Sequence, residues 1–436
     1  MGSGWYGRWM TRWETRLTTR DTNRIVRPRE WGFEWLEDFG GGRDGGAKPG
    51  AKAPVDMAAG LPGLKSRPVS ETSASADFSG VALAEEGAGD SSGGDLERMI
   101  ALNEEIVLRS DDFFAYATPA DFRLERRYPE LFQTNVRPET LARDAEMKRK
   151  AAAGELEMGE FLRFTSAVRT PYPENDQVNA RWYPAPAQSQ QAGKPKQALI
   201  VMPQWNSDAL SHNVFCTMAN RFGVSALRLS MPYHDIRRPA ELERSDYATS
   251  ANIGRTIGSC RQAVADIRSC IDWLETQGYT QFGVLGTSLG SCYAFIAAAH
   301  DPRLRICAFN HASTWFGDVV WEGQSTRHVR AGFEQAGLTQ EQVRRLFAGI
   351  SPMSYMERFA ATPKRSLVVH ATYDLTFPLH LSLDVLENFE RLGIDHVSKV
   401  LPCGHYTSGE TPYKYMVGWN LGRFVYQAFR DLARQG

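Results

Sequence analysis

The pattern of apolar and polar residues predicts alternating strands and helices from residue 198 to the C-terminus. Short apolar runs typical of buried strands are followed by longer segments in which apolar residues recur at the helical period. Two earlier strands, 161–170 and 178–183, are joined by a short connection rich in Pro and Asn, which predicts an antiparallel pair. The later strands are predicted at 198–202, 225–230, 282–285, 305–310, 366–370 and 396–401. The helices are predicted at 209–222, 252–278, the Ala-rich stretch that ends before Asp301, 379–392 and 413–434.

This alternation is typical of the α/β class, with a mainly parallel central sheet that carries helices on both faces. In such a sheet, ligands bind beyond the carboxyl ends of the strands. The segment 315–360 interrupts the alternation and contains helix-like stretches at 327–335 and 340–347. It is therefore predicted to form a helical cap over that edge, within a domain that spans residues 159–436.

The first 158 residues divide into three segments of different composition. Residues 1–39 hold five of the eleven tryptophans and a series of arginines at helical spacing, which is typical of a helix at a membrane surface. However, Arg16 falls between Trp5 and Trp9 on a helical wheel, so packing against the body or a partner is favoured over membrane contact. Residues 40–95, rich in Gly, Ala, Pro and Ser, are predicted to be a disordered linker. Residues 96–158 are predicted to be a helical extension, with helices at 96–108 and 138–153.

A Gly-x-Ser-x-Gly pattern lies at the turn between the predicted strand 282–285 and the helix that follows. Its residues are Gly286, Ser288 and Gly290. In a nucleophile elbow, the serine has a strained backbone, and the glycines leave room for the strand and the helix to approach each other. The backbone N–H of Leu289, at the start of the helix, would then point at a developing oxyanion. The alternative is a Gly-rich turn with an ordinary serine.

A serine hydroxyl is a weak nucleophile, so Ser288 requires a general base, and that base requires an orienting carboxylate. Asp374 follows the predicted strand 366–370, and His405 follows the predicted strand 396–401. Because the carboxyl ends of parallel strands meet at one edge of a sheet, we expect the three side chains to come together there.

The residues 286–290, Asp374 and Gly404-His405, in this chain order, resemble the α/β-hydrolase superfamily, in its serine esterase, lipase and dienelactone-hydrolase-like branch. The resemblance covers about residue 160 to the C-terminus. It implies an acyl-enzyme mechanism in which His405 deprotonates Ser288 and Asp374 holds the histidine tautomer. No metal and no organic cofactor are implied.

The resemblance also implies a second oxyanion donor in the loop after the strand 198–202. Many relatives carry His-Gly there, whereas this chain has Pro-Gln-Trp-Asn at 203–206. By register, the donor is assigned to the backbone N–H of Trp205, with Gln204 as the neighbouring alternative.

Further residues are candidates for the substrate pocket because they follow strands, lie in the cap or lie in the loop after the first parallel strand. His311 follows a strand at the same edge and is a further candidate for the pocket wall, whereas His300 and His370 are interpreted as structural. In the cap, Arg327 with His328 and Arg330 could hold an anionic group, although a solvated helix face explains them equally well. His234-Asp235 lacks a second ligand cluster, so no metal site is predicted. The substrate-binding candidates are Gln204, Tyr233, His234, Trp315, Arg327 and Tyr406.

The composition narrows the class of function. A formal net charge of −1 gives no reason to expect a nucleic-acid partner. The six cysteines are dispersed without a C-x-x-C pair and are predicted to be reduced core residues. No secretory signal is apparent at the N-terminus, and polar residues and glycines interrupt the apolar stretch 279–300, so a cytoplasmic location without a membrane span is predicted.

The predicted function is that of a serine hydrolase that cleaves a small or medium acyl ester. A peptidase or amidase using the same three side chains is the first alternative, disfavoured because the chain has no room for a β-propeller and no second Gly after Gly290. A non-catalytic binding protein built on the same fold is the second alternative. The natural acyl group and the oligomeric state are left open by the sequence.

Overall fold

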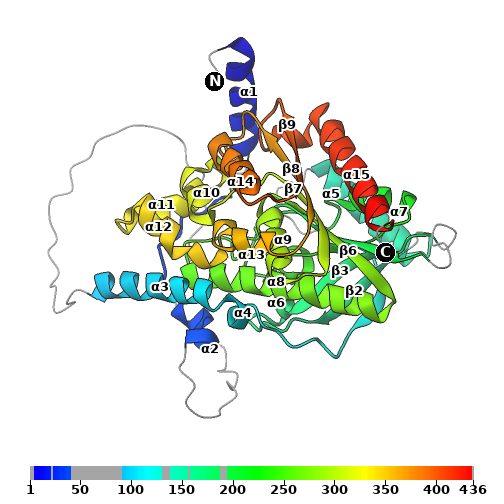
Figure 1. Ribbon diagram of the computed structural model, residues 1–436, viewed down its shortest axis with the longest axis horizontal. Helices are drawn as coiled ribbons and strands as arrows, with labels where there is room; N and C mark the ends of the chain where they lie inside the picture. Colours follow the sequence, from blue (N-terminus) through cyan, green and yellow to red (C-terminus); the bar gives the residue numbers. More distant parts are fainter. Residues whose placement is uncertain are drawn as a thin grey trace.

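A nine-stranded sheet crosses the protein in the computed structural model, which describes residues 4–20, 23–40, 91–129, 138–155, 158–186 and 194–434 (Figure 1). The strand order is β1-β2-β3-β5-β4-β6-β7-β8-β9. Pairing is antiparallel from β1 to β5 and parallel from β5 to β9. The strands are β1 Arg123–Arg127, β2 Gly159–Thr165, β3 Gln177–Tyr183, β4 Lys196–Met202, β5 Ser225–Leu229, β6 Tyr279–Thr287, β7 Leu304–Asn310, β8 Arg365–Ala371 and β9 His396–Leu401.

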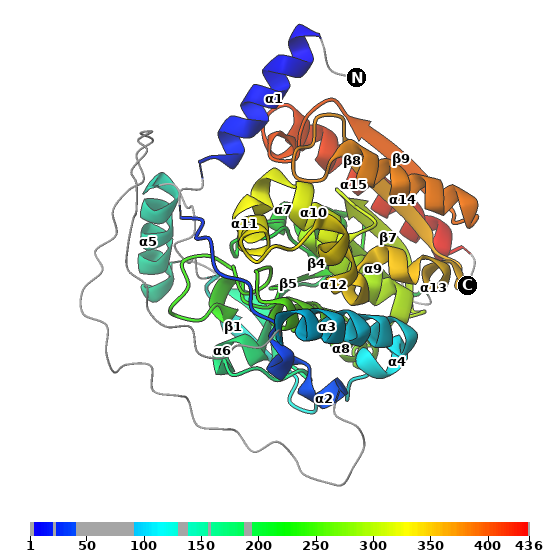
Figure 2. The same ribbon diagram turned by 90° about the vertical axis from the view of Figure 1, so that its left-hand side faces the viewer.

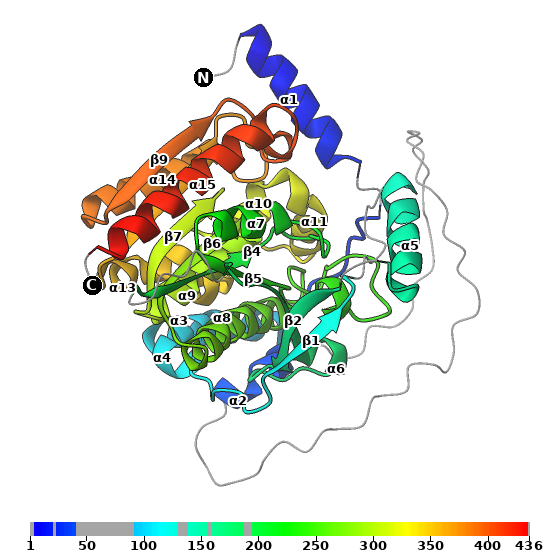
Figure 3. The ribbon, with the colours of Figure 1, turned by 90° about the vertical axis from the view of Figure 1, so that its right-hand side faces the viewer.

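Helices cover both faces of this sheet. Helices α3, α8, α9 and α14 pack on one face of the sheet, and α7 and α15 pack on the other (Figure 2 and Figure 3). The α-helices are α1 Trp5–Thr18, α2 Glu37–Gly40, α3 Ser91–Leu108, α4 Ser110–Phe113, α5 Pro138–Ala152, α6 Pro173–Asp176, α7 Asn213–Arg221, α8 Ile253–Thr276, α9 Leu289–His300, α10 Phe316–Glu322, α11 Arg327–Gln335, α12 Gln340–Leu346, α13 Met356–Ala360, α14 Leu379–Arg391 and α15 Tyr413–Leu432.

Strand β4 shows why the central strands are apolar on both sides. Ile200 and Met202 pack into the apolar cluster that contains α8 and α9, whereas Leu199 and Val201 pack into the cluster that contains α7 and α15. Successive side chains of a strand point to opposite faces, so a strand covered on both faces reads as a continuous apolar run. The predicted α/β architecture with a mainly parallel sheet is confirmed.

Two elements differ from the predictions. Strand β1 was not predicted, because its sequence is Arg-Leu-Glu-Arg-Arg and it lies at the exposed edge of the sheet, where charged side chains are favoured. The helix predicted at 209–222 begins at Asn213, since His212 has a positive φ of 69° and ends the preceding turn. By contrast, the start of α8 follows the expected pattern, because the side chain of Asn252 accepts the N–H of Arg255.

The segment 315–360 folds into helices α10 to α13. The stretches predicted at 327–335 and 340–347 correspond to α11 and α12, and α12 begins with a capping box made by Thr339 and Gln342. Arg344 of α12 forms an ion pair of 2.8 Å with the buried Asp318 of α10. The ion pair joins α10 to α12, and Phe316 and Val320 of α10 lie in the wall of a cavity that also includes Ser288.

The N-terminal helix α1 packs on the body of the protein (Figure 2). One side of α1 is buried against the body and carries Met10, Glu14 and Leu17. The opposite side faces outward and carries Trp5 and Trp9. Helices α3 and α5 correspond to the predicted helices 96–108 and 138–153. The predicted linker 40–95 is too long at its end, because α3 begins at Ser91, and its residues 41–90 lie outside the described residues. None of the helices among the described residues combines the length and the apolar character needed to cross a bilayer. All six cysteines are buried and free of disulfides.

Candidate active site

Ser288 lies at the sharp turn between β6 and α9. Its backbone has φ 56° and ψ −121°, a strained conformation for a residue with a side chain. A Cβ at Gly286 would lie 2.3 Å from the carbonyl oxygen of Gly290, and a Cβ at Gly290 would lie 2.3 Å from that of Pro203. Both glycines are therefore required by the close approach of backbone to backbone around Ser288.

The structure brings Ser288, His405 and Asp374 together at the carboxyl edge of the sheet. Oγ of Ser288 lies 3.0 Å from Nε2 of His405. Nδ1 of His405 lies 2.9 Å from Oδ2 of Asp374. With Nδ1 donating to the carboxylate, Nε2 is left as the acceptor for the serine hydroxyl, so the geometry favours proton transfer from Ser288 to His405.

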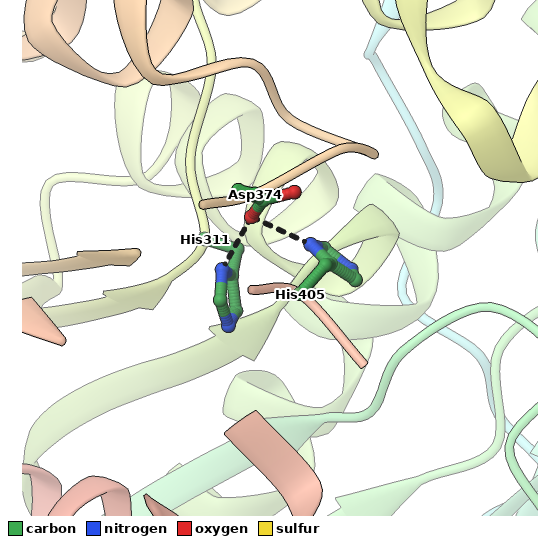
Figure 4. Close-up of side chains that lie close together, drawn as sticks. All are labelled: His311, Asp374 and His405. Atoms are coloured by element: carbon green, nitrogen blue, oxygen red, sulfur yellow. Dashed lines mark hydrogen bonds and ion pairs between the residues drawn. The ribbon is translucent and has the colours of Figure 1, made fainter. Parts of the chain in front are cut away.

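The carboxylate of Asp374 accepts four hydrogen bonds. Oδ1 accepts the backbone N–H groups of Thr376 and Phe377, at 2.8 and 2.6 Å. Oδ2 accepts Nδ1–H of His405 and also Nδ1–H of His311, at 2.9 and 2.8 Å (Figure 4). Burial raises the pKa of Asp374, but the charge of His405 and the hydrogen bonds from both histidines outweigh it, so its pKa falls below the usual range. Asp374 is therefore ionised at neutral pH.

His405 is held between aromatic and charged neighbours. Its ring stacks on Phe377 at a centroid distance of 5.1 Å and lies 4.4 Å from the ring of His311. Burial lowers the pKa of His405, but the charge and hydrogen bond of Asp374 and the charge of Glu14 more than compensate, so its pKa is raised. The surroundings therefore favour an imidazolium, the form that a general base takes after it accepts a proton.

His311 has a larger part in the site than the sequence indicated. It follows β7 directly, has a positive φ of 59°, and is buried with Nε2 3.1 Å from Oγ of Ser408. Burial and the charge of His405 lower the pKa of His311, which leaves it neutral at pH 7. Its position after the strand between β6 and β8 was the only signal in the sequence, and that signal did not reveal the bond to Asp374.

His311, Asp374 and His405 are also a group of side chains whose ligand atoms lie within 4.8 Å of one another. Both Nδ1 atoms face the same oxygen, Oδ2 of Asp374, at 2.8 and 2.9 Å. Ligand atoms in a tetrahedral zinc shell with bonds of about 2.0 Å are about 3.3 Å apart. The distances of 2.8 and 2.9 Å are those of N–H···O hydrogen bonds and are shorter than the spacing between two ligands of a zinc ion.

The backbone amides assigned to the oxyanion lie beside Ser288. Leu289 is the first residue of α9, and the contact between Gly290 and Pro203 places the loop 203–206 against the elbow. The N–H of Asn206 donates to Nε2 of His234, whereas the N–H groups of Leu289 and Trp205 have no acceptor within the described part of the chain. Both amides are thus available to an anionic oxygen.

Two cavities adjoin Ser288. The larger has a volume of about 480 Å³ and includes Gln204, Trp205, Tyr406 and His212 in its wall. Sequence reasoning missed His212, whose Nε2 lies 2.8 Å from Oγ1 of Thr287 and whose pKa is lowered by burial to about 3. A smaller cavity of about 40 Å³ is lined mainly by apolar side chains, several of them from the cap; its apolar residues include Leu289, Phe316, Val319, Val320 and Phe377.

The loop after β5 does not place its predicted candidates in either cavity wall. Tyr233 is buried in the apolar core, and its backbone N–H donates to Asn175. His234 is fully buried beneath the loop 203–206, where it accepts the N–H of Asn206. His234 therefore supports the loop that carries Trp205, while the other two candidates, Gln204 and Tyr406, line the larger cavity.

The two candidates from the cap also lie outside both walls. Trp315 precedes α10, and the guanidinium of Arg344 lies 5.6 Å from its ring. Arg327 begins α11 and is exposed. Beside it, His328 stacks on Trp205 at 5.8 Å, and Arg330 pairs with Glu334. The cap thus contributes apolar side chains to the site rather than the predicted cation.

Comparison with known families matches residues 215–325 to the family described as "Alpha/beta hydrolase domain containing 18". This match includes the elbow at Ser288 and the start of the cap, but ends before Asp374 and His405. No curated protein matches the chain.

Several solved structures are similar at low sequence identity. The acetyl xylan esterase from Paenibacillus sp. R4 covers 78% of this chain and 96% of its own, with 12% identity and a TM-score of 0.48. The match to acetyl xylan esterase 1 from Thermoanaerobacterium sp. JW/SL YS485 covers 77% of this chain and 98% of the esterase, with 14% identity and a TM-score of 0.47. The match to the Pyrococcus horikoshii acylaminoacyl peptidase covers 63% of this chain and 42% of the peptidase, with 11% identity and a TM-score of 0.46. These similarities say nothing about the substrate of this chain.

Proposed function

We propose that this chain is a serine hydrolase of the α/β-hydrolase superfamily and that it cleaves acyl esters through Ser288. The observation that carries the proposal is the distance of 3.0 Å between Oγ of Ser288 and Nε2 of His405, at a residue held with φ 56°. A strained serine in contact with an oriented imidazole is the arrangement that activates a hydroxyl as a nucleophile.

In the proposed first step, Oγ of Ser288 attacks the carbonyl carbon of the ester, and Nε2 of His405 takes the hydroxyl proton. The carbonyl oxygen becomes an oxyanion that accepts the N–H groups of Leu289 and Trp205. The intermediate collapses as the bond to the alcohol oxygen breaks, and the imidazolium of His405 protonates the departing alcohol. Asp374 stays ionised throughout and stabilises the imidazolium.

In the second step, His405 takes a proton from water, and the hydroxide attacks the acyl carbon. Collapse of this intermediate breaks the bond to Oγ of Ser288, releases the carboxylic acid and returns the proton to the serine. The two steps require neither a metal nor an organic cofactor, and the proposal includes none.

The two cavities suggest where the parts of the ester lie. The smaller cavity, of about 40 Å³, is mainly apolar and adjoins Ser288 and Leu289, so we assign it to a short acyl group. The larger cavity, of about 480 Å³, carries polar groups from Gln204 and Tyr406 and is assigned to the alcohol. A panel of p-nitrophenyl esters should give the highest kcat/KM at short acyl chains.

A fluorophosphonate probe tests the proposed nucleophile. We expect the wild-type protein to be labelled at neutral pH, and we expect Ser288→Ala to lose both labelling and at least about 10⁴-fold in kcat/KM, because the three side chains act as a unit. Ser259→Ala, a buried serine of α8, is the matched control and should be labelled like the wild type. Absence of labelling in a folded wild type, or equal labelling of Ser288→Ala, contradicts the proposal.

Matched ester and anilide substrates with the same acyl group separate an esterase from an amidase. We expect turnover of the ester to dominate. A kcat/KM for the anilide equal to that for the ester would instead favour the peptidase or amidase alternative, with the same serine as nucleophile.

We also propose a cytoplasmic location. All six cysteines are free and buried, which is typical of a protein kept in a reducing compartment. Fractionation of cells that produce the chain from its own gene tests this, and recovery in an oxidising compartment contradicts it.

A further inference from the structure

We propose, on the premise that Ser288 and His405 perform the acyl transfer described above, that Glu14 is a positioning residue for His405. Its carboxylate extends from the N-terminal helix α1 and holds the His405 loop, residues 402–409, in the conformation that presents the imidazole to Ser288.

The carboxylate of Glu14 accepts three hydrogen bonds from this loop, all made by the two residues that follow His405. The N–H of Tyr406 donates to Oε1 at 2.7 Å, and the N–H of Thr407 donates to Oε2 at 2.9 Å. Oγ1 of Thr407 donates to Oε2 at 3.1 Å. Thr407 begins the short 3₁₀ helix Thr407–Gly409. Glu14 therefore accepts hydrogen bonds from the amides at the start of a helix, as a capping side chain does. Here the cap comes from the opposite end of the chain.

The loop leaves room for this side chain. A Cβ on Gly404 would lie 2.4 Å from Oε2 and 2.5 Å from Cδ of Glu14. The N–H of Gly404 donates to Oγ1 of Thr407 at 2.7 Å, and Thr407 in turn donates to Glu14. The backbone on both sides of His405 is therefore tied, directly or through Thr407, to one buried carboxylate.

Helix α1 is itself fixed to the body, so Glu14 is presented rigidly. The hydroxyl of Tyr6 donates to the carbonyl oxygen of Pro402, the first residue of the His405 loop. The same hydroxyl lies 2.7 Å from the hydroxyl of Tyr413. Sδ of Met10 lies 3.4 Å from Oγ1 of Thr407. Glu14 is fully buried between these contacts, so its side chain has no space in which to swing away from the loop.

The charge of Glu14 adds to its geometric role. Its three partners can all act as donors, which suits an ionised carboxylate. Burial and the charge of Asp374 raise the pKa of Glu14, and the two backbone amides and the charge of His405 offset this only in part, so its pKa is raised. The titratable groups that face His405 are Asp374, His311, Glu14 and Tyr406. Glu14 in its ionised form acts with Asp374 to raise the pKa of His405.

The test is Glu14→Gln in the full chain, with Arg12→Gln as the matched control. Arg12 lies on the same helix but is exposed, so its loss changes charge without touching the loop. Glutamine has nearly the size of glutamate but presents an NH₂ group to one of the two backbone N–H donors. We expect kcat to fall about 10- to 100-fold with little change in KM, as for a misplaced catalytic group. Arg12→Gln should retain the wild-type kcat.

The pH profile separates positioning from a purely structural role. His405 must be neutral to accept a proton, so kcat/KM rises with pH through the pKa of His405. Loss of the negative charge at position 14 lowers that pKa, so the acid limb of Glu14→Gln should move to lower pH. A variant that is only less stable would show a lower melting temperature with an unchanged acid limb and an unchanged kcat per folded molecule.

Each outcome decides the proposal. If folded Glu14→Gln keeps the wild-type kcat and acid limb, Glu14 does not position His405. If Glu14→Gln does not fold, Thr407→Val takes its place, because it removes the hydroxyl between Gly404 and Glu14 while conserving shape; an unchanged kcat in that variant overturns the proposal, and a fall of about tenfold supports it. Fluorophosphonate labelling of the wild type separates a failure of the Glu14 proposal from a failure of the proposed function. If the wild type is not labelled, the proposed function fails; if it is labelled and Glu14→Gln keeps the wild-type kcat and acid limb, only the Glu14 proposal fails.

Discussion

The turn that carries Ser288 and the loop that carries His405 are stabilised in different ways. Around Ser288, the contacts are between backbone atoms: Gly286 lies against Gly290, and Gly290 lies against the carbonyl oxygen of Pro203. The N–H of Ser288 donates to the carbonyl oxygen of Asn310, on the neighbouring strand. Strands β4, β6 and β7, with helix α9, are sufficient to define this turn.

The His405 loop depends instead on side chains from distant segments. Glu14 and Tyr6 of α1 contact its backbone, and Arg24 donates to the hydroxyl of Tyr406 at 3.0 Å. Backbone contacts within adjacent elements leave a readable motif, because only glycine fits. A loop held by a remote carboxylate leaves no motif of its own, since Glu14 could lie anywhere in the chain.

The largest effect among the variants that sharpen this comparison is expected for Asp374→Asn. In either orientation its NH₂ group faces two N–H donors, which are the two imidazoles or the backbone amides of Thr376 and Phe377. It also lacks the charge that stabilises the imidazolium. We expect kcat/KM to fall about 10³- to 10⁴-fold. Because Asp374 raises the pKa of His405, the acid limb of the residual activity should move to lower pH. A pH–rate profile that keeps the wild-type limb would show that Asp374 is not coupled to His405.

A pair of glycine variants compares the two loops directly. In Gly290→Ala the new methyl group meets the carbonyl oxygens of Pro203 and Met202, at 2.3 and 2.6 Å, and backbone cannot move without distorting the elbow. In Gly404→Ala it meets the side chain of Glu14, which is more easily displaced than backbone. We expect kcat to fall about 100-fold in the first variant and about tenfold in the second.

The control for this pair is the combination of Gly404→Ala with Glu14→Gln. If the damage at position 404 acts through Glu14, the double variant should be little worse than Glu14→Gln alone. Additive losses in kcat would mean that Gly404 and Glu14 contribute independently, and would remove the distinction drawn between the two loops.

A smaller effect is expected at His311. His311→Leu removes the N–H that donates to Oδ2 of Asp374, whereas His311→Asn places an amide N–H near the position of Nδ1. We expect kcat to fall about tenfold in the leucine variant, since a hydrogen bond to a charged group is lost, and to be largely retained in the asparagine variant. Equal losses in both variants would indicate that the imidazole ring, and not its hydrogen bond, is what the site requires.

The parts of this molecule that could be predicted from the sequence are those encoded locally. The central strands are apolar on both sides, and Ser288 lies between glycines that backbone contacts require. Asp374 and His405 were placed correctly at the edge because each directly follows a parallel strand. Strand β1 was missed because an exposed edge strand has no apolar alternation.

Loop direction and remote partners could not be predicted. Tyr233 and His234 follow β5 at the correct edge, yet their loop turns into the core instead of toward Ser288. Arg327 begins the cap helix α11, which contributes no side chain to either cavity wall and leaves the arginine exposed. The contact of Glu14 with Thr407 could not be predicted from the sequence, because it depends on how α1 packs against the distant His405 loop.

The central claim is that Ser288 becomes acylated during turnover. The most direct measurement is rapid quenching of the wild-type protein with p-nitrophenyl acetate, followed by digestion and mass analysis of the acetylated peptide. We expect one acetyl group on the peptide that contains Ser288, formed in the burst phase and absent from Ser288→Ala. Turnover without an acetylated protein, or an acetyl group carried by a different residue, would contradict it.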